Sequence, residues 1–151
     1  MLGVPTRVRG LTLPSEFVTC IESGTLRRER GSWPLRFNRD AFGNPWEAEL
    51  GDVYETVSDI ERESDLLPKH FAPDRGDVPE MFSDAPGFIP YISDFSQVLT
   101  FAVAGDGAPY CFDYRERSDL PSIIWWDDAY WRRVAPDFTT FLGLFDVNQN
   151  A

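Results

Sequence analysis

The sequence of 151 residues predicts one α+β domain in which helices flank a mainly antiparallel central β-sheet. Three observations predict this class. Short runs rich in aromatic and branched residues follow one another in the C-terminal half, turn-forming residues separate these runs, and apolar residues recur at helical spacing near both ends. The length is that of one ordinary domain, and no repeat or linker divides the chain. We therefore expect a single domain over residues 1–151.

The N-terminal third predicts a helix followed by a hairpin. Pro14 fixes a backbone angle that suits a first helical turn, apolar residues then recur at helical spacing, and Gly24 supplies a left-handed stop. These features predict a helix over residues 14–23. Two runs rich in rings, Trp33–Phe37 and Trp46–Tyr54, flank a Gly-Asn-Pro turn, which predicts that they pair as strands.

A second helix and a long loop are predicted in the middle of the chain. Ser58 followed by Glu61 has the spacing of a capping box, which predicts a helix over about 59–67 that Pro68 ends. Residues 72–86 contain several Pro and Gly residues and no apolar period, so we expect a long loop there. Loops of this length in compact domains are often functional.

The C-terminal half predicts most of the sheet and a closing helix. The Gly105-Asp106-Gly107 segment offers the positive φ angles of a tight hairpin turn. Pro136 and Asp137 begin a helix whose Phe and Leu residues fall on one face, and this apolar stripe predicts that the helix covers the sheet. The expected strands are Phe88–Ile92, Val98–Ala104, Tyr110–Tyr114, Ile123–Trp126 and, as a strand or an extended lead into the helix, Tyr130–Val134.

Charge is distributed unevenly along the chain. Acidic residues number 25 and Lys and Arg residues 14, for a net charge of -11, and the densest acidic window covers residues 47–65. A field of this sign repels nucleic-acid phosphates and anionic lipids and attracts cationic surfaces. No apolar run is long enough to span a bilayer, and Met1–Gly10 lacks a secretory signal. We therefore expect a cytoplasmic protein with a basic protein partner, not nucleic acid or membrane; the alternative is that the acidic surplus serves solubility alone.

Several enzyme and metal classes lack their motifs. The sequence contains no glycine loop for nucleotide phosphates and no nucleophile elbow. His70 is the single histidine, and we expect a structural role for it. Cys20 and Cys111 are expected to be reduced and buried, and Asp106 between two glycines is more simply a turn than a calcium loop. These observations predict no metal and no cofactor.

A cluster of rings and acids keeps a carbohydrate-directed function open, either binding or weak hydrolysis. Trp125, Trp126, Asp127 and Asp128 combine flat rings with two carboxyls, as sugar sites do. Adjacent residues of a strand point to opposite faces, however, so the two indoles line one groove only if the strand is bulged. The alternative is that one Trp fills the core, the other lies on the surface, and the two Asp residues form a turn.

The order of motifs over residues 11–147 points to a known family. The C-terminal part is the most specific, with a Gly-rich turn, a Tyr-Cys-Phe-Asp strand, a Trp-Asp strand end and an Ala-Pro-Asp-Phe helix start. The motifs are Leu13-Pro14 with Phe17, Leu67-Pro68, Pro86-Gly87-Phe88-Ile89, the segment from Gly105 to Tyr114, Ile123-Ile124-Trp125-Trp126-Asp127 and Val134-Ala135-Pro136-Asp137-Phe138. In this order the chain resembles the SUKH superfamily, which includes the yeast cell-wall-synthesis regulators.

The resemblance implies an α+β fold, no enzyme activity and, for bacterial relatives, an immunity protein that binds and neutralises a cognate toxin, often a nuclease. A regulatory adaptor that acts without a toxin stays open. Nucleases bind phosphate through cationic surfaces, with which a negatively charged protein associates quickly. From charge and expected exposure, with aromatic anchors inside an acidic rim, the predicted partner-binding residues are Asp113, Tyr114, Glu116, Trp126, Asp127, Asp128, Glu61 and Asp65.

Overall fold

Helices and antiparallel strands share the chain, which confirms the predicted α+β class. The computed structural model describes residues 6–26, 32–72, 87, 89, 92–127 and 130–147. Their elements are β1 (Arg7–Val8), β2 (Leu11–Thr12), α1 (Ser15–Ser23), β3 (Trp33–Pro34), β4 (Glu49–Leu50), α2 (Val57–Asp65), α3 (Leu67–His70), β5 (Val98–Val103), β6 (Pro109–Asp113), β7 (Ser122–Asp127), β8 (Tyr130–Ala135) and α4 (Phe138–Gly143).

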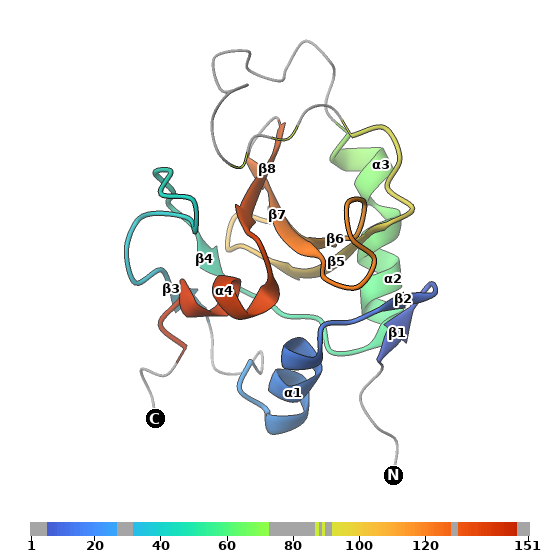
Figure 1. Cartoon of the computed structure of the whole chain (residues 1–151), viewed down its shortest axis with the longest axis horizontal. Coiled ribbons are helices and arrows are strands. Elements are labelled where there is room, and N and C mark those ends of the chain that lie inside the picture. Colours follow the sequence, from blue (N-terminus) through green and yellow to red (C-terminus); the bar gives the residue numbers. More distant parts are fainter. Residues whose placement is uncertain are drawn as a thin grey trace.

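A four-stranded antiparallel sheet in the order β5-β6-β7-β8 forms the centre of the molecule (Figure 1). In that view α2 and α3 lie on one side of the sheet, while α4 and the β3–β4 hairpin lie on the other. The chain that follows β4 covers the outer edge of β5, because Gly51 N donates to Val103 O at 2.9 Å and Tyr54 N donates to Phe101 O at 2.8 Å. This pairing places β4 beside the β5–β6 turn.

Apolar side chains pack against both faces of the sheet. On one face Phe101 and Phe112 stack at 4.1 Å between ring centroids, and Phe17 of α1 meets both rings edge-on. On the other face Leu67 of α3 belongs to a second buried cluster that includes Trp131 of β8. Full burial of one such side chain contributes about 1.5–3 kcal/mol. All five residues of β6 are buried, because this strand lies inside the sheet and apolar side chains cover both of its faces.

The first and last helices form where the sequence predicts them. Gly24 adopts a left-handed conformation with φ of 76°, and its N–H donates to the carbonyls at the end of α1. Asp137 caps α4, and its carboxylate accepts from Thr140 N at 2.8 Å. The predicted apolar stripe is buried at Phe138 and Phe141, so α4 does cover the sheet.

The predicted capping box of the second helix is wrong. The cap is Thr56, whose hydroxyl accepts from Asp59 N at 3.1 Å, so α2 begins before Ser58 reaches a cap position. Pro68 does not end α2 either, because Leu66 closes that helix and Pro68 lies in the first turn of α3. Proline is tolerated there since an amide in a first turn has no helical acceptor.

Two other predictions of local structure are wrong, one lies outside the described residues and one agrees with the structure. The hairpin of β3 and β4 is much shorter than the predicted runs. Of the predicted strand Phe88–Ile92, only Ile89 and Ile92 are described; neither lies in a strand, and both fill the second cluster. The predicted loop over 72–86 falls almost wholly outside the described residues. Cys20 and Cys111 are buried and free, as predicted.

Candidate functional site

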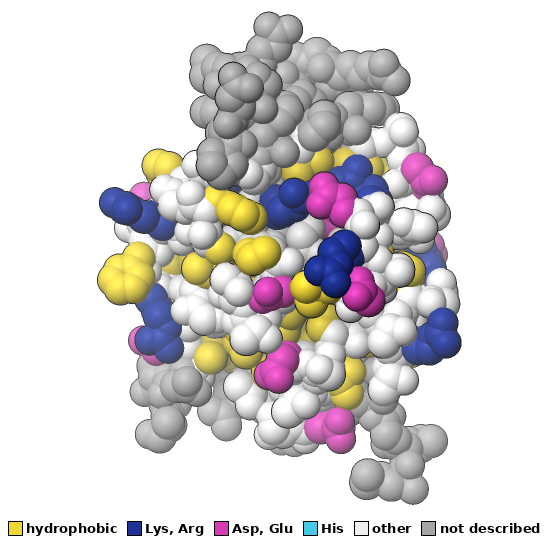
Figure 2. All heavy atoms as spheres, in the orientation of Figure 1, with side chains coloured by type: hydrophobic (Ala, Val, Ile, Leu, Met, Phe, Trp, Pro, Cys, Tyr) yellow, Lys and Arg dark blue, Asp and Glu magenta, His cyan; other side chains and the backbone are white. Residues whose placement is uncertain are grey.

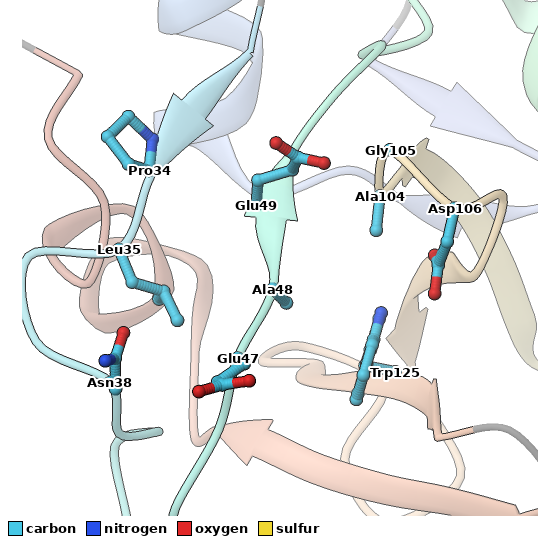
Figure 3. A pocket seen from close by; sticks show the side chains of 10 residues that line it. All are labelled: Pro34, Leu35, Asn38, Glu47, Ala48, Glu49, Ala104, Gly105, Asp106 and Trp125. Atoms are coloured by element: carbon cyan, nitrogen blue, oxygen red, sulfur yellow. The ribbon is translucent and has the colours of Figure 1, made fainter.

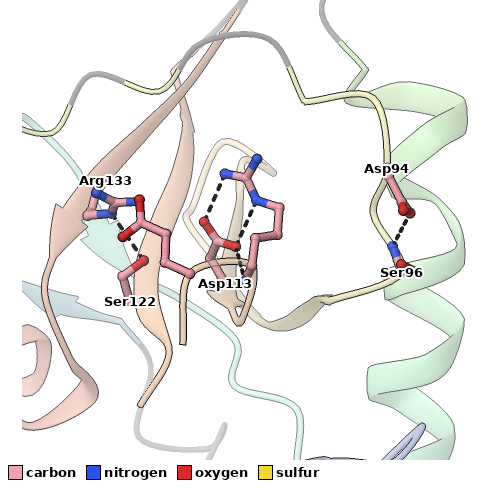
Figure 4. Close-up of polar contacts among 7 residues, drawn as sticks. Asp94, Ser96, Asp113, Ser122 and Arg133 are labelled. Carbon is pink, nitrogen blue, oxygen red and sulfur yellow. Dashed lines mark hydrogen bonds and ion pairs between the residues drawn. The ribbon is translucent and has the colours of Figure 1, made fainter. Parts of the chain in front are cut away.

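The two predicted contacts at the end of β6 are buried. Asp113 and Tyr114 are each 2% exposed, so the exposure on which their prediction depends is wrong. The Asp113 carboxylate accepts from the amide, Nε and Nη2 of Arg115 at 3.0, 2.9 and 2.9 Å (Figure 4). The Tyr114 hydroxyl donates to Thr12 O at 2.7 Å, and burial raises the pKa of Tyr114. Both side chains therefore serve the fold, because β6 lies inside the sheet.

Glu116 lies at the surface with its charge already paired. Its side chain is 73% exposed, and its carboxylate accepts from Arg133 Nη2 at 3.1 Å. Arg133 Nε also donates to Ser122 Oγ at 3.1 Å, which holds the guanidinium against β7 (Figure 4). Glu116 can meet a partner, but a basic partner has to compete with Arg133.

The turn between β7 and β8 is also held internally. Trp126 packs edge-on against Trp131 at 5.4 Å between ring centroids. The Asp127 carboxylate accepts from Arg132 Nη1 at 3.0 Å and from the Tyr130 hydroxyl at 3.2 Å. Asp128 lies outside the described residues.

The two adjacent indoles lie on opposite faces of β7. Trp125 packs against Trp46 and Tyr110 in the first cluster, while Trp126 packs against Trp131 on the other face. Trp125 and Trp126 therefore do not line one groove, which removes the geometric basis for a sugar site built from both rings.

Arg9 of the β1–β2 hairpin contacts both predicted acids of α2, Glu61 through its backbone and Asp65 through its carboxylate. Arg9 Nη2 donates to the Glu61 carbonyl oxygen at 3.1 Å and to the Asp65 carboxylate. Asp65 is 64% exposed, and Arg62 pairs with two other acids of the same helix. The acidic window is thus partly compensated by two arginines. On the face of the molecule in Figure 2, acidic and basic side chains are both present, with apolar side chains between them.

A different acidic surface lies where the β3–β4 hairpin meets the turn between β5 and β6. It is a hollow of about 450 Å³. Three carboxylates line it, those of Glu47, Glu49 and Asp106 (Figure 3). Among the described residues no Lys, Arg or His lines it, and none of the three carboxylates forms an ion pair with that part of the chain. We call this surface the acidic pocket; its lining residues are Pro34, Leu35, Asn38, Glu47, Ala48, Glu49, Ala104, Gly105, Asp106 and Trp125.

An unpaired hydrogen-bond donor lies on the wall of the acidic pocket. Trp125 is 7% exposed, and its indole nitrogen has no partner among the described residues. Figure 3 shows this nitrogen turned toward Ala104 and Asp106. Trp46 also has an unpaired indole nitrogen, but Trp46 does not line the acidic pocket.

The β4 wall of the acidic pocket is held by a hydrogen bond from β6. The Tyr110 hydroxyl donates to the Glu49 carbonyl oxygen at 2.8 Å. Burial, followed by the charges of Asp106 and Glu49, raises the pKa of Tyr110 well above its usual value. The phenol thus stays a neutral donor, which ties the β4 wall to the sheet.

Comparison with known proteins identifies the family. The sequence profile of the SMI1 / KNR4 family (SUKH-1) matches residues 7–143. The chain belongs to this family. No curated protein and no solved structure gave a significant match. SUKH members are generally non-enzymatic immunity proteins, so membership is consistent with a role in toxin immunity.

The acidic pocket of this SUKH-1 protein was missed by the sequence reasoning. Glu47 and Glu49 belong to the acidic window over residues 47–65, which was the available signal. The sequence predicts Asp106 only as a turn residue. The hydrogen bonds between residues 51–54 and β5 bring Glu47 and Glu49 close to Asp106, and no motif in the sequence predicts that pairing.

The described residues offer the SUKH-1 protein little for metal chemistry or membrane insertion. In that part of the chain no group of three or more His, Cys, Asp or Glu side chains could hold a metal ion. No helix there has the length and apolar character that crossing a membrane demands. His70 is exposed at the end of α3, where its ring contacts Phe71.

Proposed function

We propose that this SUKH-1 protein is a cytoplasmic immunity protein that binds and neutralises a cognate basic toxin, such as a nuclease. It acts by covering the toxin's cationic surface and catalyses no reaction. Neither nucleic acid nor membrane is its partner. The observation that carries the proposal is the surplus of carboxylates that the protein's own basic residues leave uncompensated.

The charges support this function quantitatively. A net charge of -11 means that at least eleven carboxylate charges stay uncompensated even when every Lys and Arg is paired. The acidic pocket concentrates three such carboxylates at one open surface. A nuclease offers arginines and lysines that otherwise bind phosphate, and carboxylates make the same charge-assisted hydrogen bonds with them. Long-range attraction between the two surfaces accelerates their encounter.

Co-expression tests the proposal directly. The reading frame next to this gene is expressed alone, together with this protein, and together with a control variant, Glu22→Gln/Asp119→Asn. This variant loses two negative charges at exposed positions that do not line the acidic pocket. We expect the neighbour to stop growth and both forms of this protein to restore it. A neighbour that binds without any toxicity would instead support a regulatory adaptor.

The rate of association provides a second, physical test. Electrostatic steering predicts that the association rate constant of the complex falls steeply as ionic strength rises, because screening shortens the reach of the acidic field. Stopped-flow or surface plasmon resonance at several salt concentrations measures this dependence. A salt-independent rate, or salt-independent retention on a carbohydrate affinity gel, would contradict the proposal.

A further inference from the structure

We infer that the acidic pocket receives an arginine side chain of the toxin, and that a main-chain carbonyl of the same toxin segment accepts the hydrogen bond of Trp125 Nε1. The inference rests on the proposed function and narrows it to one surface and one kind of residue. The predicted contacts elsewhere are mostly engaged within the protein, whereas the acidic pocket has carboxylates without a basic partner among the described residues and, in its wall, a buried indole N–H without an acceptor.

The charge of the pocket selects a cation. Glu47, Glu49 and Asp106 come from two different hairpins and line one hollow, and none of its described lining residues is basic. A guanidinium group carries five N–H donors in a planar fork and stays charged at any working pH, so it can satisfy more than one carboxylate at once. A lysine ammonium offers a point charge with more rotational freedom and matches this arrangement less well.

The unpaired indole distinguishes a peptide from a simple ion. A buried N–H without an acceptor is unfavourable, and most such groups in folded proteins find a partner. A metal ion or free ammonium in the pocket has no acceptor to offer Trp125 Nε1. An arginine residue within a polypeptide brings a cation and a carbonyl oxygen together, which are the two groups that the pocket lacks.

The pocket is held in place before any ligand arrives. Tyr110 fixes the Glu49 backbone, and the Asp106 carboxylate accepts from Ala108 N at 3.0 Å. Gly105 lies directly against Glu49, since a Cβ at Gly105 would be 1.9 Å from Glu49 Oε1. A hollow fixed in this way loses little conformational entropy on binding.

An exposed aromatic ring beside the pocket fits the same partner. Phe37 is 77% exposed, the largest exposure of any large apolar side chain in the described residues. Asn38 lines the acidic pocket and also the neighbouring hollow that Phe37 lines. An apolar anchor next to a charged pocket is the arrangement found at energetically dominant contacts of protein interfaces.

The inference is tested without the toxin, using N-acetyl-arginine methylamide as the probe and its neutral analogue N-acetyl-citrulline methylamide as the control. Two-dimensional NMR of the full chain resolves the indole N–H signals of its five Trp residues, and Trp125→Phe assigns the signal of interest. We expect millimolar arginine probe to shift the Trp125 signal in a saturable way, and the citrulline probe to leave it unchanged. Glu47→Gln/Glu49→Gln should weaken arginine binding roughly fivefold, whereas the control Glu22→Gln/Asp119→Asn retains it.

Two results would overturn the inference. One is a Trp125 signal that does not respond to the arginine probe; the other is equal weakening by the pocket variant and the charge-matched control. Neither result touches the proposed function, which growth rescue tests separately. If the arginine probe binds but this protein does not neutralise the product of the neighbouring reading frame, arginine binding by the pocket is supported and the proposed immunity function is wrong. If the pocket variant binds the toxin as tightly as the wild type while rescue succeeds, the pocket is wrong and the immunity function is retained.

Discussion

Two acidic regions of this protein differ in what their carboxylates contact. Near the β7–β8 turn, Asp127 and the buried Asp40 share the guanidinium of Arg132. In the acidic pocket, Glu47 and Asp106 have no basic partner among the described residues. The first region combines rings and acids within a few residues of sequence and yet serves the fold. The second is assembled from distant segments and remains open to a partner.

The region of paired acids is a network of ion pairs and hydrogen bonds, centred on Arg132, that connects two segments of the fold. Arg132 Nη2 donates to Asp40 at 2.8 Å and also to Pro45 O at 3.1 Å, so one side chain fastens the loop before β4 to β8. Burial alone would lower the pKa of Arg132, but its hydrogen bonds to Asp40 and Asp127 outweigh burial and raise the pKa. The Asp40 carboxylate accepts in addition from Phe42 N at 2.9 Å, which closes the loop.

Removing the Arg132 side chain from this network should produce the largest effect on stability. Arg132→Gln leaves Asp40, whose side chain is 0% exposed, as a buried charge without its cation. We expect a loss of about 3 kcal/mol in the free energy of unfolding, measured by chemical denaturation. The control Arg117→Gln removes an exposed ion pair and should cost less than about 1 kcal/mol. Equal losses in the two variants would mean that the Arg132 network is no more than a surface pair.

Neutralising the unpaired acids should act on binding and spare the fold. Glu47→Gln/Glu49→Gln is expected to weaken the complex with the toxin by about tenfold, mostly through faster dissociation, because the carboxylates contact the arginine directly. Asp127→Asn removes a carboxylate that already serves Arg132 and should change affinity less than about twofold. Surface plasmon resonance of both variants at one salt concentration measures the contrast. A larger loss with Asp127→Asn would reverse the comparison between the two regions.

The sequence predicts the local elements well where a residue's chemistry determines its conformation. Gly24 ends α1 in a left-handed conformation and Asp137 caps α4, both as predicted. The capping of α2 was wrong because Thr56 and Ser58 are both competent caps, and packing against the sheet decides between them. Propensity and spacing thus determine the element, while tertiary contacts determine its boundary.

The candidate site was predicted less well because exposure depends on tertiary structure. Asp113 and Tyr114 lie at the end of a strand, where neighbouring side chains point to opposite faces of the sheet. A strand residue is exposed only if the face to which it points is left uncovered by the rest of the fold. The two neighbours point to opposite sides of the sheet, and both sides are covered: Tyr114 belongs to the first buried cluster and donates to Thr12 O, while Asp113 is buried with Arg115 as its partner. The pocket could not be predicted since it needs the contact between residues 51–54 and β5, a long-range pairing without a local signature.

Alkaline pH offers a way to sharpen the comparison, because a buried phenol supports the acidic pocket. Tyr110 has a raised pKa, so its hydroxyl stays protonated in the fold while the unfolded chain ionises near pH 10. The stabilisation is therefore complete below about pH 10 and declines by about 1.4 kcal/mol per pH unit above it for this group. Chemical unfolding at increasing alkaline pH should give a steep fall for the wild type. Tyr110→Phe should show a shallower fall, while an unchanged slope would mean that Tyr110 ionises in the folded state.

The smallest predicted effect concerns Phe37, which tests whether the apolar ring beside the acidic pocket belongs to the same surface. Phe37→Ser should change the free energy of unfolding by less than about 0.5 kcal/mol, because the ring is 77% exposed and loses few contacts. The affinity for the toxin should fall by about 1 kcal/mol, since an exposed ring next to a charged pocket is buried only in the complex. Leu120→Ser is the matched control: Leu120 is 42% exposed and lines neither the acidic pocket nor its neighbour. Equal affinities for Phe37→Ser and Leu120→Ser, measured by calorimetry, would confine the interface to the carboxylates; a selective loss with Phe37→Ser makes the ring and the acids one binding surface.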